Sequence, residues 1–309
     1  MENLNRYVSS RGLLKSCSAY NNNPSSSSTF IDYSIIERLP PYGSIYICTD
    51  ALLNFYSYIL KNIHHPFTLV TGDSDYSVSK ELLSNEIFED LINNPLLLNW
   101  FAQNANIKHP KIQHLPIGND YHTMYEKPGL WELNQYTAIN QENKLINIFS
   151  NAIDFENRFN IAYCNWHFSI NNGNRHECLN ELDKSICYFE NYPLPRFASW
   201  ERQSKFKFVI SPAGVGIDCH RTWESLFLGC IPIIKSSSID ILFKDLPVLI
   251  VDNWSDINRD KLNLFLESLP DKIFNFDSLY LTYWTSKIKG SNPASSLVSS
   301  FSDYRNKIT

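Results

Sequence analysis

Residues 211–224 place two glycines among acidic, basic and hydroxyl side chains within a short stretch, Ser-Pro-Ala-Gly-Val-Gly-Ile-Asp-Cys-His-Arg-Thr-Trp-Glu. Gly214 and Gly216 remove side chains where a ligand could approach the backbone. A helix that begins after them would present free N–H groups and partial positive charge, which suit an anion. The stretch therefore predicts an anion-binding site, and the alternative is an ordinary glycine turn in an α/β core.

The side chains at the start of this helix extend the prediction. Asp218 can cap the helix, and His220 and Arg221 add hydrogen-bond donors at the same end. Glu224 lies three residues after Arg221 on the same helix face, so it can accept from a pair of sugar hydroxyls or form an ion pair with Arg221. A phosphate beside Arg221 and a ribose on Glu224 would suit a nucleoside diphosphate. The spacing matches neither the dinucleotide fingerprint nor a P-loop.

A second polar group follows an apolar run in the first half of the chain, where Thr-Gly-Asp-Ser-Asp occupies residues 71–75. Asp73 and Asp75 can act as a general base, or they can cap a helix over 78–83. The pair also matches the Asp-x-Asp pattern of metal-dependent sugar transferases of another fold, a role that we do not favour here. Asp120 and His122 follow a later strand and are assigned to substrate contact or to the surface.

Short apolar runs alternate with amphipathic segments, which is typical of parallel sheets covered by helices. Because open α/β sheets bind ligands at the carboxyl ends of their strands, both polar groups are expected at such edges. The polar residues 1–28 predict a mobile arm or a loop, and residues 124–150 predict a boundary with a connecting helix over 132–145. The predicted strands cover 44–48, 67–70, 96–101 and 111–116, then 160–164, 206–210, 231–234 and 247–251.

Composition bounds the class of protein. The 309 residues suffice for about two domains, and a hydrophobic share of 43% indicates a globular chain. The net charge of −5 disfavours a broad nucleic-acid contact. Seven scattered cysteines without a Cys-x-x-Cys pair favour a reducing compartment. We find neither a signal peptide nor an apolar run long enough to span a membrane, so a cytoplasmic location is expected.

Two motifs resemble a known family. Ser-Pro-x-Gly-x-Gly-x-Asp-x-His-Arg-x-Trp-Glu, followed by Leu-Gly-Cys-Ile-Pro-Ile, resembles the C-terminal signature of exostosin-like glycosyltransferases of the family 47 type. Trp-Phe-x-x-Asn at 100–104 with Pro-Ile-Gly at 116–118 resembles the N-terminal half of the same family. A chain of this size, rich in asparagine, also looks like the short soluble members from large algal viruses, which are chlorovirus xylosyltransferase-like.

This resemblance implies an α/β fold with two Rossmann-like domains and a cleft between them, the GT-B type. Residues 1–145 would form the acceptor-side domain, 146–275 the nucleotide-sugar-binding domain, and 276–309 a helix and tail that pack back on the first domain. The implied reaction is inverting transfer from a UDP-sugar, with UDP-xylose as the best guess, to a glycan acceptor. The alternatives are a GDP-sugar transferase of the fucosyl type and a catalytically inactive glycan-binding module.

The resemblance also assigns roles within the cleft. Asp73 is the expected base, with Asp75 and Asp120 in reserve, and His122 lies on the acceptor side. No metal or other cofactor is expected to be required, because arginines and the helix dipole can stabilise the leaving diphosphate. Arg175 is assigned to a phosphate contact or to a solvated helix start. The expected donor-binding residues are Asn165, His167, Arg175, Ser211, Gly214, Gly216, Asp218, His220, Arg221 and Glu224.

Overall fold

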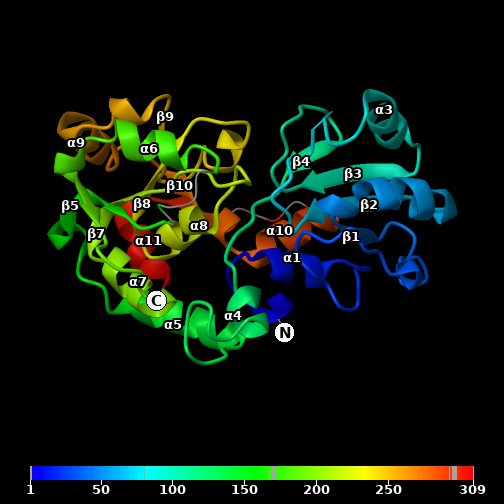
Figure 1. Ribbon diagram of the computed structural model, residues 1–309, viewed down its shortest axis with the longest axis horizontal. Helices are drawn as coiled ribbons and strands as arrows, with labels where there is room; N and C mark the ends of the chain where they lie inside the picture. The colour runs from blue at the N-terminus through cyan, green and yellow to red at the C-terminus, as the bar shows by residue number, and fades with distance from the viewer. Residues whose placement is uncertain are drawn as a thin grey trace.

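The computed structural model describes residues 2–79, 81–166, 168, 172–291, 293 and 298–308. The chain forms two lobes, each built on a parallel β-sheet with helices packed around it (Figure 1). The two sheets come from separate halves of the chain, as alternating strand and helix patterns predict. The prediction of two Rossmann-like α/β domains is therefore confirmed.

The first sheet has four parallel strands in chain order, which are β1 (Ser44–Cys48), β2 (Phe67–Gly72), β3 (Leu97–Ala102) and β4 (Ile112–His114). Every residue of β1 and β2 is buried, which explains why these strands read as short unbroken apolar runs. A succession of short helical turns, Thr49–Ala51, Leu52–Asn54, Phe55–Ile59 and Leu60–Asn62, joins β1 to β2. Helix α3 (Asn85–Asn93) precedes β3.

The second sheet has five parallel strands in the order β6-β5-β7-β8-β9. These are β5 (Phe159–Cys164), β6 (Cys187–Phe189), β7 (Phe206–Ile210), β8 (Ile231–Lys235) and β9 (Leu249–Val251). The helices of this lobe are α6 (Arg175–Glu181), α7 (Arg196–Gln203), α8 (His220–Phe227) and α9 (Arg259–Ser268). Strand β7 is the central strand of this sheet. The glycine loop that follows β7 therefore lies in the middle of the edge formed by the carboxyl ends of the strands.

Two helix predictions were wrong. Val78 makes an isolated parallel bridge with Ala105 in place of a helical turn, and residues 79 and 81–83 form bends and turns. The connecting helix begins later than predicted, because α4 (His122–Glu126) is followed by a loop and Thr137 caps α5 (Ala138–Ser150). At the first place the β-bridge of Val78, and at the second the N-cap of Thr137, decides the local structure, and both outweigh the helix preference of the sequence.

Of the two alternatives predicted for residues 1–28, a mobile arm or a loop, the mobile arm is wrong. Tyr7, Val8 and Leu13 are fully buried, and Ser9 caps helix α1 (Ser10–Ser16). The Tyr7 ring stacks on Phe227 of the second lobe with 4.4 Å between centroids. Few apolar residues lie in this stretch, but most of them are buried, and composition averaged over the segment conceals this.

The C-terminal part of the chain divides between the lobes. Helix α10 (Leu281–Ile288) packs against α1 beneath the first lobe (Figure 1). Two short strands, β10 (Phe274–Asn275) and β11 (Val298–Ser299), then pair, and α11 (Phe301–Ile308) lies on the second lobe. There Phe301 packs edge-on against Phe155. The expectation that 276–309 packs back on the first domain was therefore wrong for the tail.

Within the described residues, no helix has the length and apolar character needed to cross a bilayer.

A matched pair of leucine truncations tests the burial of the N-terminal segment. Leu13 is fully buried, whereas Leu4 in the same segment is 70% exposed. We expect Leu13→Ala to lower the free energy of unfolding by about 2–5 kcal/mol, and Leu4→Ala by less than about 0.5 kcal/mol. Urea unfolding followed by fluorescence measures both. Equal small effects would return the segment to the status of a mobile arm.

Candidate functional site

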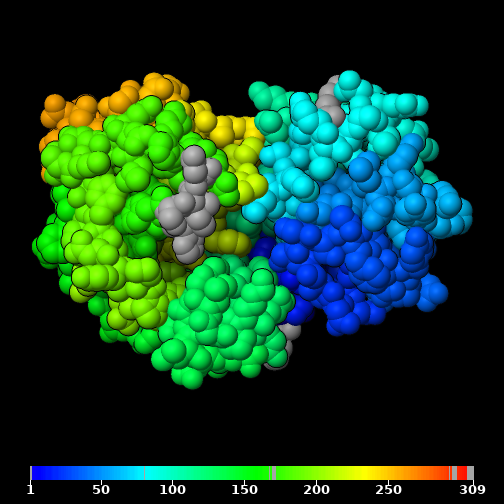
Figure 2. All heavy atoms as spheres, viewed as in Figure 1, coloured from blue at the N-terminus to red at the C-terminus, as the bar shows by residue number. Residues whose placement is uncertain are grey.

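The carboxyl edges of the two sheets face each other, and loops from both meet there. Figure 2 shows the hollow between the lobes, with the segment around α4 at its lower edge. The Ile117 N–H donates to Asp218 Oδ2 at 2.8 Å, and the Asp218 N–H donates to Asn104 Oδ1 at 2.8 Å. His220 Nδ1 lies 2.6 Å from the Gly118 carbonyl oxygen. The predicted anion loop is therefore also one of the contacts between the lobes.

Asp218 does not cap α8, which corrects the sequence prediction. The N-cap residue is Cys219, which makes no side-chain capping bond. The Asp218 carboxylate instead accepts from the Trp223 indole N–H at 2.9 and 3.0 Å and from Ile117. Burial outweighs these donors and raises the pKa of Asp218 to about 6. A buried carboxylate that joins two lobes is thus also a titrating group.

The two glycines of the loop make room for protein groups. A Cβ on Gly214 would lie 2.8 Å from Arg175 Nη2, and a Cβ on Gly216 would lie 3.2 Å from Asp75 Oδ1. Gly216 therefore allows the Asp75 loop of the first lobe to approach, and Gly214 allows Arg175 to lie against the loop. We had expected a ligand alone to use this space.

Arg221 and Arg175 form a pair of neighbouring cations behind the loop. Arg221 Nε donates to the Asn165 carbonyl oxygen at 2.9 Å. Burial, with a contribution from the nearby Arg175 charge, lowers the pKa of Arg221. Arg175 Nε is buried without a hydrogen-bond partner among the residues that the structure describes. Because like charges repel in a partly desolvated site, an anion between them would be stabilised.

Glu224 pairs with Arg196 and not with Arg221, so the intrahelical ion pair is not formed. The Arg196 guanidinium lies 4.7 Å from the Trp131 ring centroid and 4.9 Å from that of Trp200. We did not predict Arg196, since the segment 193–200 reads as a loop with no distinctive spacing. The approach of a ribose to Glu224 would therefore compete with, or add to, the Arg196 contact.

The remaining predicted donor residues support the loop from behind. Asn165 Nδ2 donates to Ser199 Oγ at 2.6 Å, while its carbonyl holds Arg221. Ser211 and Thr222 share a hydrogen bond of 2.8 Å between their hydroxyls. His167 lies outside the described residues. These contacts fix the loop to α8 and to the end of β5.

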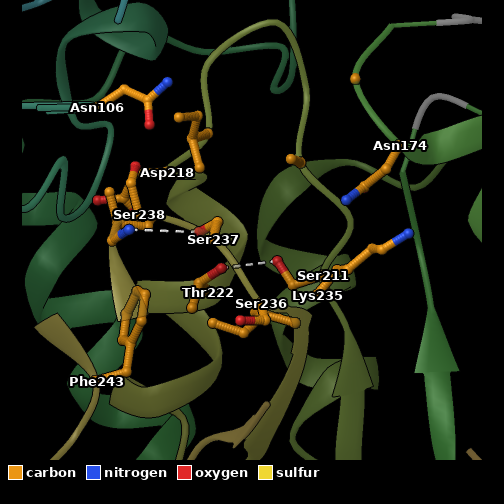
Figure 3. A pocket seen from close by; sticks show the side chains of 15 residues that line it. Asn106, Asn174, Ser211, Asp218, Thr222, Lys235, Ser236, Ser237, Ser238 and Phe243 are labelled. Atoms are coloured by element: carbon orange, nitrogen blue, oxygen red, sulfur yellow. Dashed lines mark hydrogen bonds between the residues drawn. The ribbon is translucent and has the colours of Figure 1, made fainter. Parts of the chain in front are cut away.

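A cavity of about 370 Å³ opens beside the loop, between it and the first lobe. In Figure 3, Asn106 of the first lobe lies on one side and Asn174 on the other, with Ser211 and Thr222 between them. Ser211 and Asp218 are the only predicted side chains in its lining as described, whereas Arg175, His220, Arg221 and Glu224 lie outside it. The lining also includes Lys235, Ser236, Ser237, Ser238 and Phe243, which we did not predict.

Lys235 shows how the missed part of the lining could have been found. It is the last residue of β8, so the three serines after it lie at the same carboxyl edge as the glycine loop. The strand itself was predicted, and the rule that ligands bind at this edge applies to every strand of the sheet. Lys235 pairs with Glu177 of α6.

In the first lobe, Asp73 is held by an arginine. It follows β2 with a positive φ of 55°, and its side chain is 4% exposed. Arg11 Nη2 lies 3.2 Å from Asp73 Oδ2, and Ser26 Oγ donates to Oδ1 at 2.8 Å. No helix begins at Asp73 or Asp75, so the alternative capping roles were wrong. Asp75 is exposed and faces Gly216 across the cleft.

Asp120 and His122 are buried, so the alternative surface role is wrong for both. His122 Nδ1 lies 3.0 Å from Asp120 Oδ1, and the Thr123 N–H and hydroxyl donate to the same carboxylate. Burial pushes the pKa of Asp120 upward, but the charges of His122, His220 and Arg196 outweigh it and hold that pKa below its usual range. The cations of the second lobe thus act on the first.

The sequence analysis predicts that the activity requires no metal ion. Across the part of the chain that the structure describes, no group of three or more His, Cys, Asp or Glu side chains is arranged to hold a metal ion. The prediction concerns activity, so it stays a prediction.

The buried Asp218 gives a pH dependence of stability. Its pKa is raised in the folded chain, so its contribution to stability is present below the unfolded pKa, near 4, and is lost as pH rises through about 6. We expect the free energy of unfolding of the wild type, minus that of Asp218→Asn, to fall by on the order of 1–3 kcal/mol between about pH 4 and pH 7. Urea titrations across this range measure it. A difference that stays constant or grows with pH would contradict the assignment.

Comparison with known proteins finds only distant likeness. No protein-family model matches the chain, and no curated protein matches it. A crystal structure of an α1,3-fucosyltransferase covers 96% of this chain and 95% of its own, at 14% identity and a TM-score of 0.36. Structures described with GDP-fucose and with GDP match at 15% and 13% identity, with TM-scores of 0.37 and 0.35, and cover 95% and 92% of their own chains. Likeness at this distance selects neither a family nor a donor, and the exostosin-like resemblance stays a prediction.

Proposed function

We propose that this chain is a glycosyltransferase that binds a nucleoside diphosphate sugar on its second lobe and a glycan acceptor against its first. The observation that carries the proposal is the pair of guanidinium groups, Arg175 and Arg221, behind the glycine loop at the carboxyl edge of the second sheet. Parallel α/β sheets bind nucleotides at this edge, and the N-terminus of α8 adds its dipole.

A diphosphate satisfies what this arrangement leaves unsatisfied. Burial and the nearby charge of Arg175 destabilise the Arg221 cation, and a doubly charged anion would offset both effects. The leaving diphosphate gains negative charge in the transition state of sugar transfer, so the same groups stabilise the transition state more than the ground state. The adjacent cavity of about 370 Å³ falls in the range of small-molecule sites and is offered to the nucleoside.

We assign the acceptor to the first lobe because the acidic and histidine side chains that face the glycine loop lie there. Asp73, Asp75, Asp120 and His122 follow strands β2 and β4 and lie across the cleft from the loop. We propose a single displacement at the anomeric carbon with inversion, which needs one of these groups to take the acceptor proton. NMR of the product will show the opposite anomeric configuration to the donor if this is correct.

The donor sugar is proposed at the level of the nucleoside diphosphate. UDP-xylose is the prediction from the sequence resemblance, and a GDP-sugar is its alternative. The lining of the cavity includes Asn106, Asn174 and three serines, which can hydrogen-bond to uracil or to guanine. Donor turnover should therefore be measured with UDP-xylose, other UDP-sugars and GDP-fucose side by side.

Removal of Arg175 tests the diphosphate assignment. We expect Arg175→Ala to weaken UDP or GDP, whichever binds, by about 10- to 100-fold, because a charged hydrogen-bonding partner is lost. Binding of the parent nucleoside should stay within about twofold, since it has no phosphate. Isothermal titration calorimetry measures both ligands.

Arg259→Ala is the matched control for this experiment. Arg259 is exposed on α9 and donates to the Asn160 carbonyl at the start of β5, which is the opposite edge of the sheet. It should leave both affinities unchanged. If Arg175→Ala binds the nucleoside diphosphate as tightly as this control, the site assignment is wrong. A wild type that binds oligosaccharide but no nucleotide would identify the chain as an inactive glycan-binding module.

A further inference from the structure

Lys235 is the only cation among the described residues that line the cavity beside the glycine loop. The other ionisable side chain of this lining is Asp218, whose carboxylate is already hydrogen-bonded to the first lobe. Arg175 and Arg221 lie outside the lining. The described wall of the cavity therefore offers an anionic ligand one positive charge, that of Lys235.

The position of Lys235 follows from strand β8. The residues Ile231–Ile234 of this strand are buried, and Lys235 is its last residue, at the carboxyl edge of the sheet. Strand β8 lies next to β7, and the N–H of Ser211, where the glycine loop begins, donates to the Ile233 carbonyl oxygen at 2.9 Å. Lys235 is thus carried by the strand beside the one that leads into the glycine loop.

An ion pair with Glu177 holds the Lys235 ammonium against helix α6. Glu177 is the third residue of this helix, and Arg175 is its first. The Arg175 guanidinium lies against the glycine loop, since a Cβ on Gly214 would be 2.8 Å from its Nη2. Asn174, directly before Arg175, lies on the same side of the cavity as Lys235 (Figure 3). Lys235 is therefore placed between the cavity and the helix that carries Arg175.

The neighbouring hydroxyl groups cannot take the role of this cation. Ser236 Oγ donates to Asp240 Oδ2 at 2.7 Å, and Ser238 Oγ donates to the Ala105 carbonyl oxygen at 2.9 Å. A hydroxyl has one proton, so these two groups can accept from a ligand but cannot donate to it. They suit the N–H and O–H groups of a nucleoside, whereas the oxygens of a phosphate need a donor such as Lys235.

The ion pair of Lys235 with Glu177 can be exchanged for a ligand. The two side chains are 24% and 39% exposed, and they come from different elements. An ion pair at such exposure adds little net stability, because water and salt screen the attraction. A nucleoside diphosphate carries more negative charge than one carboxylate, and it offers more oxygen atoms to the three N–H groups of the ammonium. Its phosphate is therefore expected to displace Glu177.

We propose that Lys235 binds the phosphate attached to the nucleoside, and that Glu177 competes with this phosphate for Lys235 and so limits nucleotide affinity. The inference rests on the proposed function, which places the nucleoside in the cavity and the diphosphate beside Arg175 and Arg221. The phosphate that joins these two parts is the one nearest to the wall that carries Lys235. Glu177, once displaced, remains partly exposed, so water can solvate its carboxylate.

Two single variants should change nucleotide affinity in opposite directions. Lys235→Met keeps an unbranched stem and removes the charge, and we expect it to weaken UMP and UDP, or GMP and GDP where these bind, by about 10-fold. Glu177→Gln removes the competitor and should tighten the same ligands by about two- to fivefold. The parent nucleoside should bind both variants within about twofold of wild type. Isothermal titration calorimetry at a fixed ionic strength measures all three ligands.

The double variant separates direct contact from a change in local charge. If Lys235 only neutralised Glu177, Lys235→Met would have no effect in the Glu177→Gln background, whereas direct contact predicts a loss of about 10-fold there too. Lys144→Met and Glu201→Gln are the matched controls. These residues of α5 and α7 form an exposed ion pair on the same lobe, outside the cavity lining, and both variants should bind as the wild type does.

The outcomes distinguish the inference from the proposed function. Nucleotide affinity of Lys235→Met equal to that of Lys144→Met would overturn the inference alone, provided that the wild type binds the nucleotide. An equal loss for the parent nucleoside would place Lys235 on the base and would also overturn it. A gain in affinity for Glu177→Gln supports the competition and cannot arise from misfolding. A wild type that binds no nucleoside diphosphate would overturn the proposed function, and the inference with it.

Discussion

The buried Asp218 carboxylate is the constraint on which the arrangement of the cleft depends. It accepts from Ile117 of the first lobe and from Trp223 of α8, while its own N–H donates to Asn104. Asn104 has a positive φ of 51°, and its side chain also donates to the Ser74 carbonyl. The loops after β2, β3, β4 and β7 are therefore fixed relative to one another through two side chains. Removal of either partner would leave buried polar groups unpaired, which is costly.

The electrostatics of the cleft follow from this arrangement. Cations gather behind the glycine loop of the second lobe, and the first lobe contributes Asp73, Asp75, Asp120 and His122 at the facing edge. Transfer of a sugar from a diphosphate needs positive charge at the leaving group and a proton acceptor on the opposite side. Under the proposed function each lobe supplies one of these requirements, so neither lobe alone is expected to catalyse transfer.

The sequence predicts the sheets well because their strands are buried on both faces. Phe206–Ile210 and Ser44–Cys48 were located to the residue, since each is a short apolar run bounded by polar turns. It predicts the glycine loop for a similar reason, as the chemistry is concentrated within a few positions. What it cannot predict is pairing across long separations. Glu224 pairs with Arg196 and Asp73 with Arg11, and no periodicity relates these partners.

The same limit explains why the capping role predicted for Asp218 was wrong. Asp218 stands where an N-cap residue is expected, but an indole N–H five residues later and a main-chain N–H from the other lobe bind its carboxylate instead.

The central claim is that a nucleoside diphosphate binds beside Gly214 and Gly216. The most direct measurement is a crystal structure of the chain with UDP or GDP. The account predicts the diphosphate in contact with Arg175 and Arg221, and a diphosphate bound elsewhere would contradict it.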